Sequence, residues 1–279
     1  MMTLPEGVVR TTMGVYLLSD DDGLSRAVGE YGRLTLDENW AEITHFARYI
    51  PAGGVVIDAG AAQGDHTEVF SLLVGVEGHV YAFEPHPRAC AALRLNTARL
   101  NNVTVRECAL GYATSGIANF ALSISQGCSS VFPSGCGGYE TSFADGSTRP
   151  LAFTSVAQTS LDSCLLPQLT RCDFLHFDME GSEPFALIGA QELIRRFRPV
   201  IVVEVGLTHL KRWRLTPEMV LELLALMGYT TTDLNDIVSA GGEGFGRVWN
   251  VLAVPTPGVV FTAKVVPTID GNPVSPGLP

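Results

Sequence analysis

Five carboxylates lie at or just after the ends of short apolar runs of this sequence, and they are the side chains best placed to do chemistry. They are Asp58, Glu84, Asp178, Glu180 and Glu204. Short apolar runs bounded by turn residues are typical of buried strands in a parallel sheet. Because ligands of such α/β proteins bind at the carboxyl ends of the strands, we expect these acids to face a bound molecule. Carboxylates can accept hydrogen bonds from hydroxyl groups, attract a cation or take up a proton.

A turn of small residues follows the first of these runs and leads into a predicted helix. It comprises Gly60, Ala61, Ala62, Gln63 and Gly64. Glycines at a strand-to-helix turn let the backbone approach a ligand closely, and the helix N-terminus favours an anionic group. Glu84 lies 24 positions after Gly60, near the roughly 20 expected for an acid that binds ribose hydroxyls, and Pro85 follows it directly. This order of elements predicts a site for an adenine nucleoside.

The turn departs from the dinucleotide-binding pattern G-x-G-x-x-G, because Ala62 and Asp65 occupy the second and third glycine positions. Asp58 and Asp65 would repel a pyrophosphate, whereas they could attract the ammonium and sulfonium groups of S-adenosylmethionine. The sequence therefore favours S-adenosylmethionine over NAD as the cofactor. A turn without a ligand, a non-catalytic nucleoside-binding module and an NAD-dependent oxidoreductase stay open as alternatives.

The end of the third predicted strand, at 103–106, is where the adenine ring would lie in such an architecture. Cys108 and Ala109 follow this strand and are candidate contacts for the base. An ordinary strand end is the alternative interpretation of these two residues.

The motif DFLHFDMEGSE combines a fourth strand with a cluster of acids. Side chains of a strand alternate, so His176 and Asp178 share a face, with Asp178 at the carboxyl end and Glu180 in the turn that follows. Three acids within six residues after a buried strand are costly unless they bind something. The next predicted strand, at 200–203, ends on another acid, Glu204.

Composition restricts the class of protein. The chain has 279 residues, enough for one large α/β domain, and its 29 acidic residues outnumber its 18 lysines and arginines, which gives a net charge of −11. This balance opposes binding to phosphates, so we expect no nucleic acid partner. No segment approaches the roughly 18 uninterrupted apolar residues of a membrane span, and no export signal is visible, so we expect a cytoplasmic protein without membrane contact. The six cysteines include no C-x-x-C pair and are expected to be reduced thiols.

The pattern of the chain predicts three parts. We expect an N-terminal extension with short strands over 1–36, a main α/β domain over 37–254, and a proline-rich tail over 255–279 that is extended or disordered. Within the main domain, a Gly- and Ser-rich stretch at 126–147 interrupts the rhythm between two predicted strands. A long irregular segment at this place predicts a lid over the site.

In order and spacing, the motifs DAGAAQG, YAFEP, ALG, LD, FDMEGSE and RPVIVVEV resemble the FkbM family of S-adenosylmethionine-dependent methyltransferases, over residues 35–254. The resemblance implies the class I methyltransferase fold: a Rossmann-like, seven-stranded and mostly parallel sheet, with helices on both faces and a C-terminal antiparallel strand pair. It also implies methylation of a hydroxyl group on a small molecule, namely a sugar or natural product, or on a glycan.

By the same resemblance, the methionine end of the cofactor lies against Asp58, Gly60 and Gly64, and its ribose against Glu84. The acids that face the reacting centre are Asp178, Glu180 and Glu204. Two positions depart from the family's pattern. Its usual asparagine in the turn is Ala62 here, and the lysine common two positions before the strand-end aspartate is His176. If that lysine orients an acid, His176 does so only with a pH-dependent charge.

Methyl transfer to a hydroxyl requires a group that removes the proton. A carboxylate in a dry pocket can have a raised pKa, which makes Asp178 the leading base candidate, with His176 and with His209 in the loop after the fifth strand as alternatives. A divalent cation shared by Asp178, Glu180 and Glu204 could instead acidify the hydroxyl. The sequence favours a protein base with no metal, because these oxygen ligands lack a diagnostic spacing.

Overall fold

The computed structural model describes most of the main domain and short pieces of both terminal parts. The described residues are 4–6, 8–11, 15–18, 43–122, 130–132, 140–142, 148–150, 152–234, 248–259, 261, 268–269 and 272–273. Most of the predicted lid and tail lies outside these residues, as does the stretch 19–42, which runs from the predicted extension into the start of the predicted main domain.

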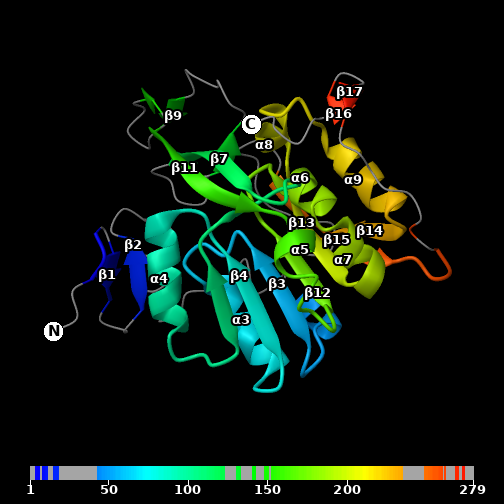
Figure 1. The fold of residues 1–279 in the computed structure, drawn as a ribbon, viewed down its shortest axis with the longest axis horizontal. Coiled ribbons are helices and arrows are strands. Elements are labelled where there is room, and N and C mark those ends of the chain that lie inside the picture. The colour runs from blue at the N-terminus through cyan, green and yellow to red at the C-terminus, as the bar shows by residue number, and fades with distance from the viewer. Residues whose placement is uncertain are drawn as a thin grey trace.

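Seven strands form the central sheet, in the order β14-β15-β13-β12-β3-β4-β5 (Figure 1). Their bounds are β3 (Val55–Ala59), β4 (His79–Phe83), β5 (Val103–Arg106), β12 (Phe174–Phe177), β13 (Val200–Gly206), β14 (Tyr229–Asp233) and β15 (Val248–Pro255). β15 pairs antiparallel with β13 and with β14, and the other neighbouring strands pair parallel. This arrangement confirms the predicted mostly parallel sheet with a C-terminal antiparallel pair.

Helices cover both faces of this sheet. On one face lie η1 (Ala47–Tyr49), α3 (Asp65–Val74) and α4 (Pro87–Thr97); on the other lie α5 (Leu161–Cys164), α6 (Glu183–Ile188), α7 (Gln191–Phe197) and α9 (Pro217–Leu226), while α8 (Leu207–Lys211) follows β13. Alternating strand side chains explain the two layers. Val56 of β3 packs in one cluster with Phe70 of α3, whereas Ile57 packs in another with Leu224 of α9. None of the described helices combines the length and the apolar character needed to span a membrane.

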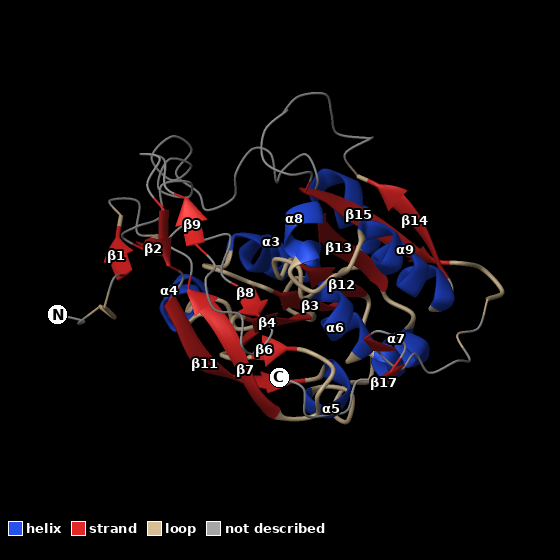
Figure 2. Ribbon diagram, turned by 90° about the horizontal axis from the view of Figure 1, so that it is seen from above, coloured by secondary structure: helices blue, strands red, loops and turns tan. Residues whose placement is uncertain are grey.

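A second sheet of four strands adjoins the carboxyl edge of the first. Its order is β6-β11-β7-β8, with β6 (Ala109–Leu110), β7 (Gly116–Leu122), β8 (Ser130–Phe132) and β11 (Ala152–Thr159). Phe120 of β7 meets the ring of His86, which follows β4, with ring centroids 6.2 Å apart. Figure 2 shows β7 and β11 on the side of the molecule where α4 lies, away from β14. The two strands predicted around the lid therefore belong to a separate sheet, which the sequence pattern does not reveal.

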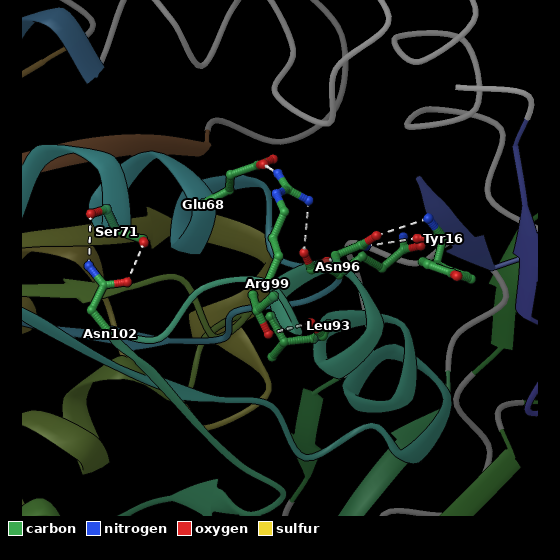
Figure 3. A network of polar contacts seen from close by, with 9 residues as sticks. Tyr16, Glu68, Ser71, Leu93, Asn96, Arg99 and Asn102 are labelled. Carbon is green, nitrogen blue, oxygen red and sulfur yellow. Dashed lines mark hydrogen bonds and ion pairs between the residues drawn. The ribbon is translucent and has the colours of Figure 1, made fainter. Parts of the chain in front are cut away.

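Three two-stranded ribbons complete the described strands. They are β1 (Val8–Arg10) with β2 (Tyr16–Leu18), β9 (Glu140–Ser142) with β10 (Thr148–Pro150), and β16 (Thr268–Ile269) with β17 (Asn272–Pro273). The side-chain amide of Asn96 in α4 anchors the first ribbon, because it accepts from Tyr16 N and donates to Tyr16 O, both at 2.8 Å (Figure 3). The same amide donates to Gln63 O at 2.9 Å. One side chain thus ties the N-terminal strand to the small-residue turn.

Candidate functional site

Backbone N–H groups of the small-residue turn after β3 donate hydrogen bonds to oxygen atoms of the protein. Gly60 N and Ala61 N donate to the backbone oxygen of the last residue of β4 at 2.9 and 3.0 Å, and Gly64 N donates to Ala61 O at 2.8 Å. Ala62 N donates to Glu84 Oε2 at 2.8 Å. Donors paired in this way do not surround a pyrophosphate, which agrees with the departure of the turn from the dinucleotide pattern.

Close packing requires two glycines of this turn. Gly60 has φ +87°, and a Cβ there would lie 1.7 Å from Asp178 O; Gly64 has φ +102°, and its Cβ would lie 2.8 Å from Leu93 Cδ1. Gly60 therefore lets the turn after β12 lie directly against the turn after β3. Ala62 also has a positive φ, of 46°, a conformation that asparagine adopts more readily than alanine.

Backbone donors hold Glu84 on both sides. Its Oε2 accepts from Ala62 N at 2.8 Å and its Oε1 accepts from His86 N at 2.7 Å. Whether or not it is protonated, the carboxyl group keeps a further lone pair that can accept a hydrogen bond from a hydroxyl group. Burial raises the pKa of Glu84 to about 8. Pro85 leads into α4, whose first turn is capped by His86 Nδ1, which accepts from Arg88 N at 3.2 Å.

Asp58 is fully buried, and protein groups meet both of its carboxylate oxygens. Thr67 Oγ1 of α3 donates to Oδ2 at 2.5 Å, and His176 Nδ1 of β12 lies 2.9 Å from Oδ1. His176 is only 3% exposed, so it is out of reach of a large acceptor molecule. Its ring nitrogen pairs with the acid of the neighbouring strand, an arrangement that the motif containing His176 and Asp178 does not predict.

His66, in the first turn of α3, lies beside this pair, and no motif of the sequence singles it out. Its ring centroid is 4.5 Å from that of His176, and its Nδ1 lies 3.4 Å from Asp65 Oδ2. Burial disfavours the charged form, but the charges of Asp65, Asp58 and Asp178 raise the pKa of His66 to about 9. The imidazole is therefore protonated at neutral pH.

Glu183 shapes the turn that carries Asp178. Its Oε1 accepts from Met179 N at 2.7 Å and from Gly181 N at 3.1 Å. Burial raises the pKa of Glu183 to about 7. Burial, together with the charge of Glu204, also raises the pKa of Asp178 to about 7. An acid with this pKa at a strand end can bind or release a proton near neutral pH.

His209 lies between two carboxylates and belongs to α8, so its prediction as a loop residue is wrong. Its Nε2 is 3.1 Å from Glu180 Oε2 and its Nδ1 is 3.7 Å from Glu204 Oε2. Glu204 lies within β13 and not at its end, because the strand extends to Gly206. A Cβ on Gly206 would lie 2.4 Å from His209 Nδ1, so this glycine makes room for the imidazole. Burial and the charge of Arg212 lower the pKa of His209.

The family model of the methyltransferase FkbM domain matches residues 58–231 of the chain. The chain belongs to the FkbM methyltransferase family. It is an S-adenosylmethionine-dependent methyltransferase, which confirms the predicted cofactor. No sequence among curated proteins matches it.

Several solved methyltransferases have a similar fold. The FkbM methyltransferase of Methylobacillus flagellatus is 15% identical, with 83% of this chain and 61% of that chain covered and a TM-score of 0.43. An S-adenosylmethionine-dependent O-methyltransferase of Thermotoga maritima is 12% identical, with 90% and 78% covered and a TM-score of 0.44. An rRNA methylase of Streptococcus thermophilus is 11% identical, with 77% and 94% covered and a TM-score of 0.42.

The structure shows what the two departures of this FkbM methyltransferase from the family pattern do. Ala62 occupies a left-handed position, which is why asparagine suits it. His176 of β12 faces Asp58 of the neighbouring strand β3, so a lysine at position 176 would bring a permanent positive charge to that acid.

The shared cation that the sequence left open as an alternative would need Asp178, Glu180 and Glu204 together, and these three acids do not form one group of candidate ligands. Among the residues that the structure describes, Glu180 and Glu204 come together with His209, and candidate ligand atoms of these three lie within 4.8 Å of one another. Asp178 does not belong to this group. Nε2 of His209 faces Glu180 and Nδ1 faces Glu204, so one imidazole lies between the two acids.

Cys108 and Ala109 lie where the two sheets meet. Ala109 opens β6 and is buried in a cluster with Phe120, so it can offer a ligand only its backbone. Cys108 is half-buried, and burial raises its pKa to about 11, which keeps the thiol neutral. The described cysteines are free, in agreement with the predicted reduced thiols.

Proposed function

We propose that this FkbM methyltransferase transfers the methyl group of S-adenosylmethionine to a hydroxyl group of a sugar, a glycan or another natural product. The observation that carries the proposal is the place of Asp178, a partly exposed acid directly after β12 in the turn that lies against Gly60, where burial and the charge of Glu204 raise its pKa to about 7. A hydroxyl group must lose its proton as it is methylated, and the best base for this task is one poised near the working pH. Asp178 meets that requirement.

In the proposed reaction, the hydroxyl oxygen attacks the sulfonium methyl carbon in line with the departing sulfur. The C–O bond forms as the C–S bond breaks, and the electron pair of the C–S bond returns to sulfur. Asp178 takes the hydroxyl proton, and the products are the methyl ether and S-adenosylhomocysteine. Holding the two reactants in line supplies much of the rate enhancement in such displacements.

We infer that the cofactor lies along the carboxyl edge of β3, β4 and β5. The ribose is proposed to lie against Glu84 and Pro85, and the adenine against Cys108 and the backbone of Ala109. The methionine end is proposed to lie against Asp58 and the turn residues Gly60, Ala61, Gln63 and Gly64. Both oxygens of Asp58 already have protein partners, so this acid acts on the sulfonium through its charge.

The other predicted catalytic residues have supporting roles in this proposal. His176 orients Asp58, with which it pairs at 2.9 Å. Glu180 and Glu204 lie on either side of the His209 imidazole and contribute negative charge near the developing bond. The charge of Glu204 also raises the proton affinity of Asp178, which makes it a stronger base.

Charge and aromatic side chains support a small-molecule or glycan acceptor. The net charge of −11 disfavours a nucleic acid. Phe185 of α6 and Trp213, which follows α8, pack with ring centroids 4.5 Å apart, and Tyr112 lies 6.2 Å from Phe185. Both helices border the turn that carries Asp178. Aromatic side chains of this kind commonly line small-molecule pockets.

The test incubates the protein with S-adenosylmethionine carrying a labelled methyl group and with panels of hydroxylated sugars, glycans and natural products. We expect the label in an ether linkage, with an equal amount of S-adenosylhomocysteine. Labelling of amines or RNA in parallel panels, with none of the hydroxyl compounds, would overturn the proposed acceptor. Calorimetry that detects no binding of S-adenosylmethionine would overturn the proposed site.

A further inference from the structure

His66 is a buried polar group to which the proposed reaction assigns no task. It is the second residue of α3, and its side chain is 12% exposed. Its Nδ1 faces Asp65 Oδ2 at 3.4 Å. Its Nε2 is buried and has no hydrogen-bond partner within the part of the chain that the structure describes. Buried polar atoms are almost always paired, so this nitrogen indicates a missing ligand.

The groups around His66 determine the chemistry of that ligand. Asp65 faces the imidazole from α3 itself, Asp58 from β3, and His176 and Asp178 from β12 and the turn after it. The three carboxylates keep the imidazole protonated, with a pKa of about 9, so Nε2 is a donor at neutral pH. The missing partner must therefore accept a hydrogen bond, and a negatively charged oxygen makes the strongest bond with a charged donor.

We propose that His66 Nε2 binds the α-carboxylate of the methionine part of S-adenosylmethionine. The inference rests on the proposed cofactor site, in which the methionine end lies against the small-residue turn that directly precedes α3. The cofactor carries two positive groups, the ammonium and the sulfonium, and one negative group, the carboxylate. Asp58 and Asp178 match the positive groups, whereas the His66 imidazolium matches the carboxylate.

This contact makes His66 a residue that determines cofactor specificity. Decarboxylated S-adenosylmethionine retains the ammonium, the sulfonium and the adenosine but lacks the carboxylate. In the complex of the protein with this decarboxylated analogue, His66 Nε2 would have no carboxylate to accept its hydrogen bond. A site with a buried donor for one group rejects an analogue that lacks this group.

Calorimetry on the full chain, with S-adenosylmethionine and its decarboxylated analogue, tests the proposal. We expect the wild type to prefer S-adenosylmethionine by about tenfold to hundredfold, the range of a hydrogen bond to a charged group. His66→Phe keeps a ring against His176 and should lose this preference, while its affinity for the analogue is unchanged. His66→Gln keeps a neutral donor and should lose part of the preference. The control His79→Phe alters a half-buried histidine at the amino end of β4, on the opposite edge of the sheet, and should leave both affinities unchanged.

The outcomes separate this inference from the proposed site. If His66→Phe binds S-adenosylmethionine as tightly as the wild type does and still prefers it to the decarboxylated analogue, His66 is not the carboxylate ligand. The proposed cofactor site would then remain supported. If the wild type binds neither compound, the proposed cofactor site is wrong. Should the variants fail to fold, the wild-type preference must decline as the pH rises beyond about 9. A preference that stays constant there overturns the inference.

Discussion

The acids and the histidine around the turn after β3 have different proton affinities because their surroundings differ. Glu84 is buried, which raises its pKa to about 8, and Asp178 is partly buried beside the charge of Glu204, which raises its pKa to about 7. Asp65 is also buried, but its contact with His66 lowers its pKa, and the charges around His66 raise the pKa of that histidine. In many active sites, such differences in pKa decide which group acts as the base and which group keeps a fixed charge.

The role of Asp178 as the base is tested by Asp178→Asn, which keeps the size of the side chain and removes its proton affinity. We expect kcat to fall by about a hundredfold or more, since a positioned base contributes on this scale. Cofactor affinity should change little. In the wild type, kcat should rise as the pH passes about 7 and Asp178 loses its proton, and the variant should lack this rise. Stopped assays across pH measure both effects; turnover equal to the wild type, or to that of the exposed control Glu222→Gln, would rule out the role.

Ala62 is a position where a substitution should stabilise the protein. Its φ of 46° is costly for alanine, whereas asparagine adopts this conformation more readily. Ala62→Asn should therefore raise the free energy of unfolding by about 0.5–1 kcal/mol. Urea unfolding followed by fluorescence measures the change. The control Ala98→Asn, at a right-handed position after α4, should bring no gain, and an equal gain there would contradict the explanation.

At the level of elements, the site depends on how the turn between β12 and α6 is held against the turn after β3. The close approach of Asp178 O to Gly60 joins the two turns, and the carboxylate of Glu183 joins the N–H groups of Met179 and Gly181. Glu183 is the first residue of α6, so the start of that helix holds the turn that directly follows the proposed base. The geometry around Asp178 is therefore a property of both elements together.

Glu183→Ala should disorganise this turn, because it leaves two N–H groups without their acceptor in a buried place. We expect a loss of about 2–4 kcal/mol in the free energy of unfolding, together with reduced kcat. Glu183→Gln keeps an acceptor oxygen and should retain most of the stability. Thermal unfolding and turnover of both variants measure the difference. If the alanine variant is as stable as the control Glu192→Ala, which loses only an exposed ion pair with Arg195, the turn does not depend on Glu183.

At the level of the whole molecule, the pKa shifts predict how stability varies with pH. The folded pKa values of Asp178, Glu183 and Glu84 are raised to about 7, about 7 and about 8, so the folded state holds protons that the unfolded state has released. His66, raised to about 9, acts in the same direction at higher pH. Where the folded state binds more protons, stability falls as the pH rises.

We therefore expect the cofactor-free protein to have its highest Tm near about pH 5 and a progressively lower Tm toward about pH 9. Differential scanning calorimetry at constant ionic strength measures the trend. Glu84→Gln should flatten the part of the curve between about pH 5 and 8, because it removes one of the raised groups. A Tm that increases over this range would show that these acids are not buried as described.

Much of the fold could be predicted because it depends on local order along the chain. The apolar runs, the turn at Gly60 and the acid at Glu84 follow one another at the spacing of a βαβ unit, and the structure has the predicted sheet with its antiparallel pair. The second sheet could not be predicted, since β6 has two residues and its pairing with β11 joins distant segments. The position of His209 in α8 was missed because a helix of five residues has too little periodicity to recognise.

The sequence by itself determined the family, the cofactor and the edge of the sheet where the acids gather, because these depend on residue order and on the alternation of strand side chains. Only the tertiary structure decided which of these acids have partners. Asp58 and His176 are 118 positions apart, and they meet only because β3 and β12 are neighbours in the sheet. His66 likewise lies in the site only through tertiary packing, since α3 places its ring against that of His176. Burial and charge at such contacts set the pKa values, and neither can be read from the order of residues.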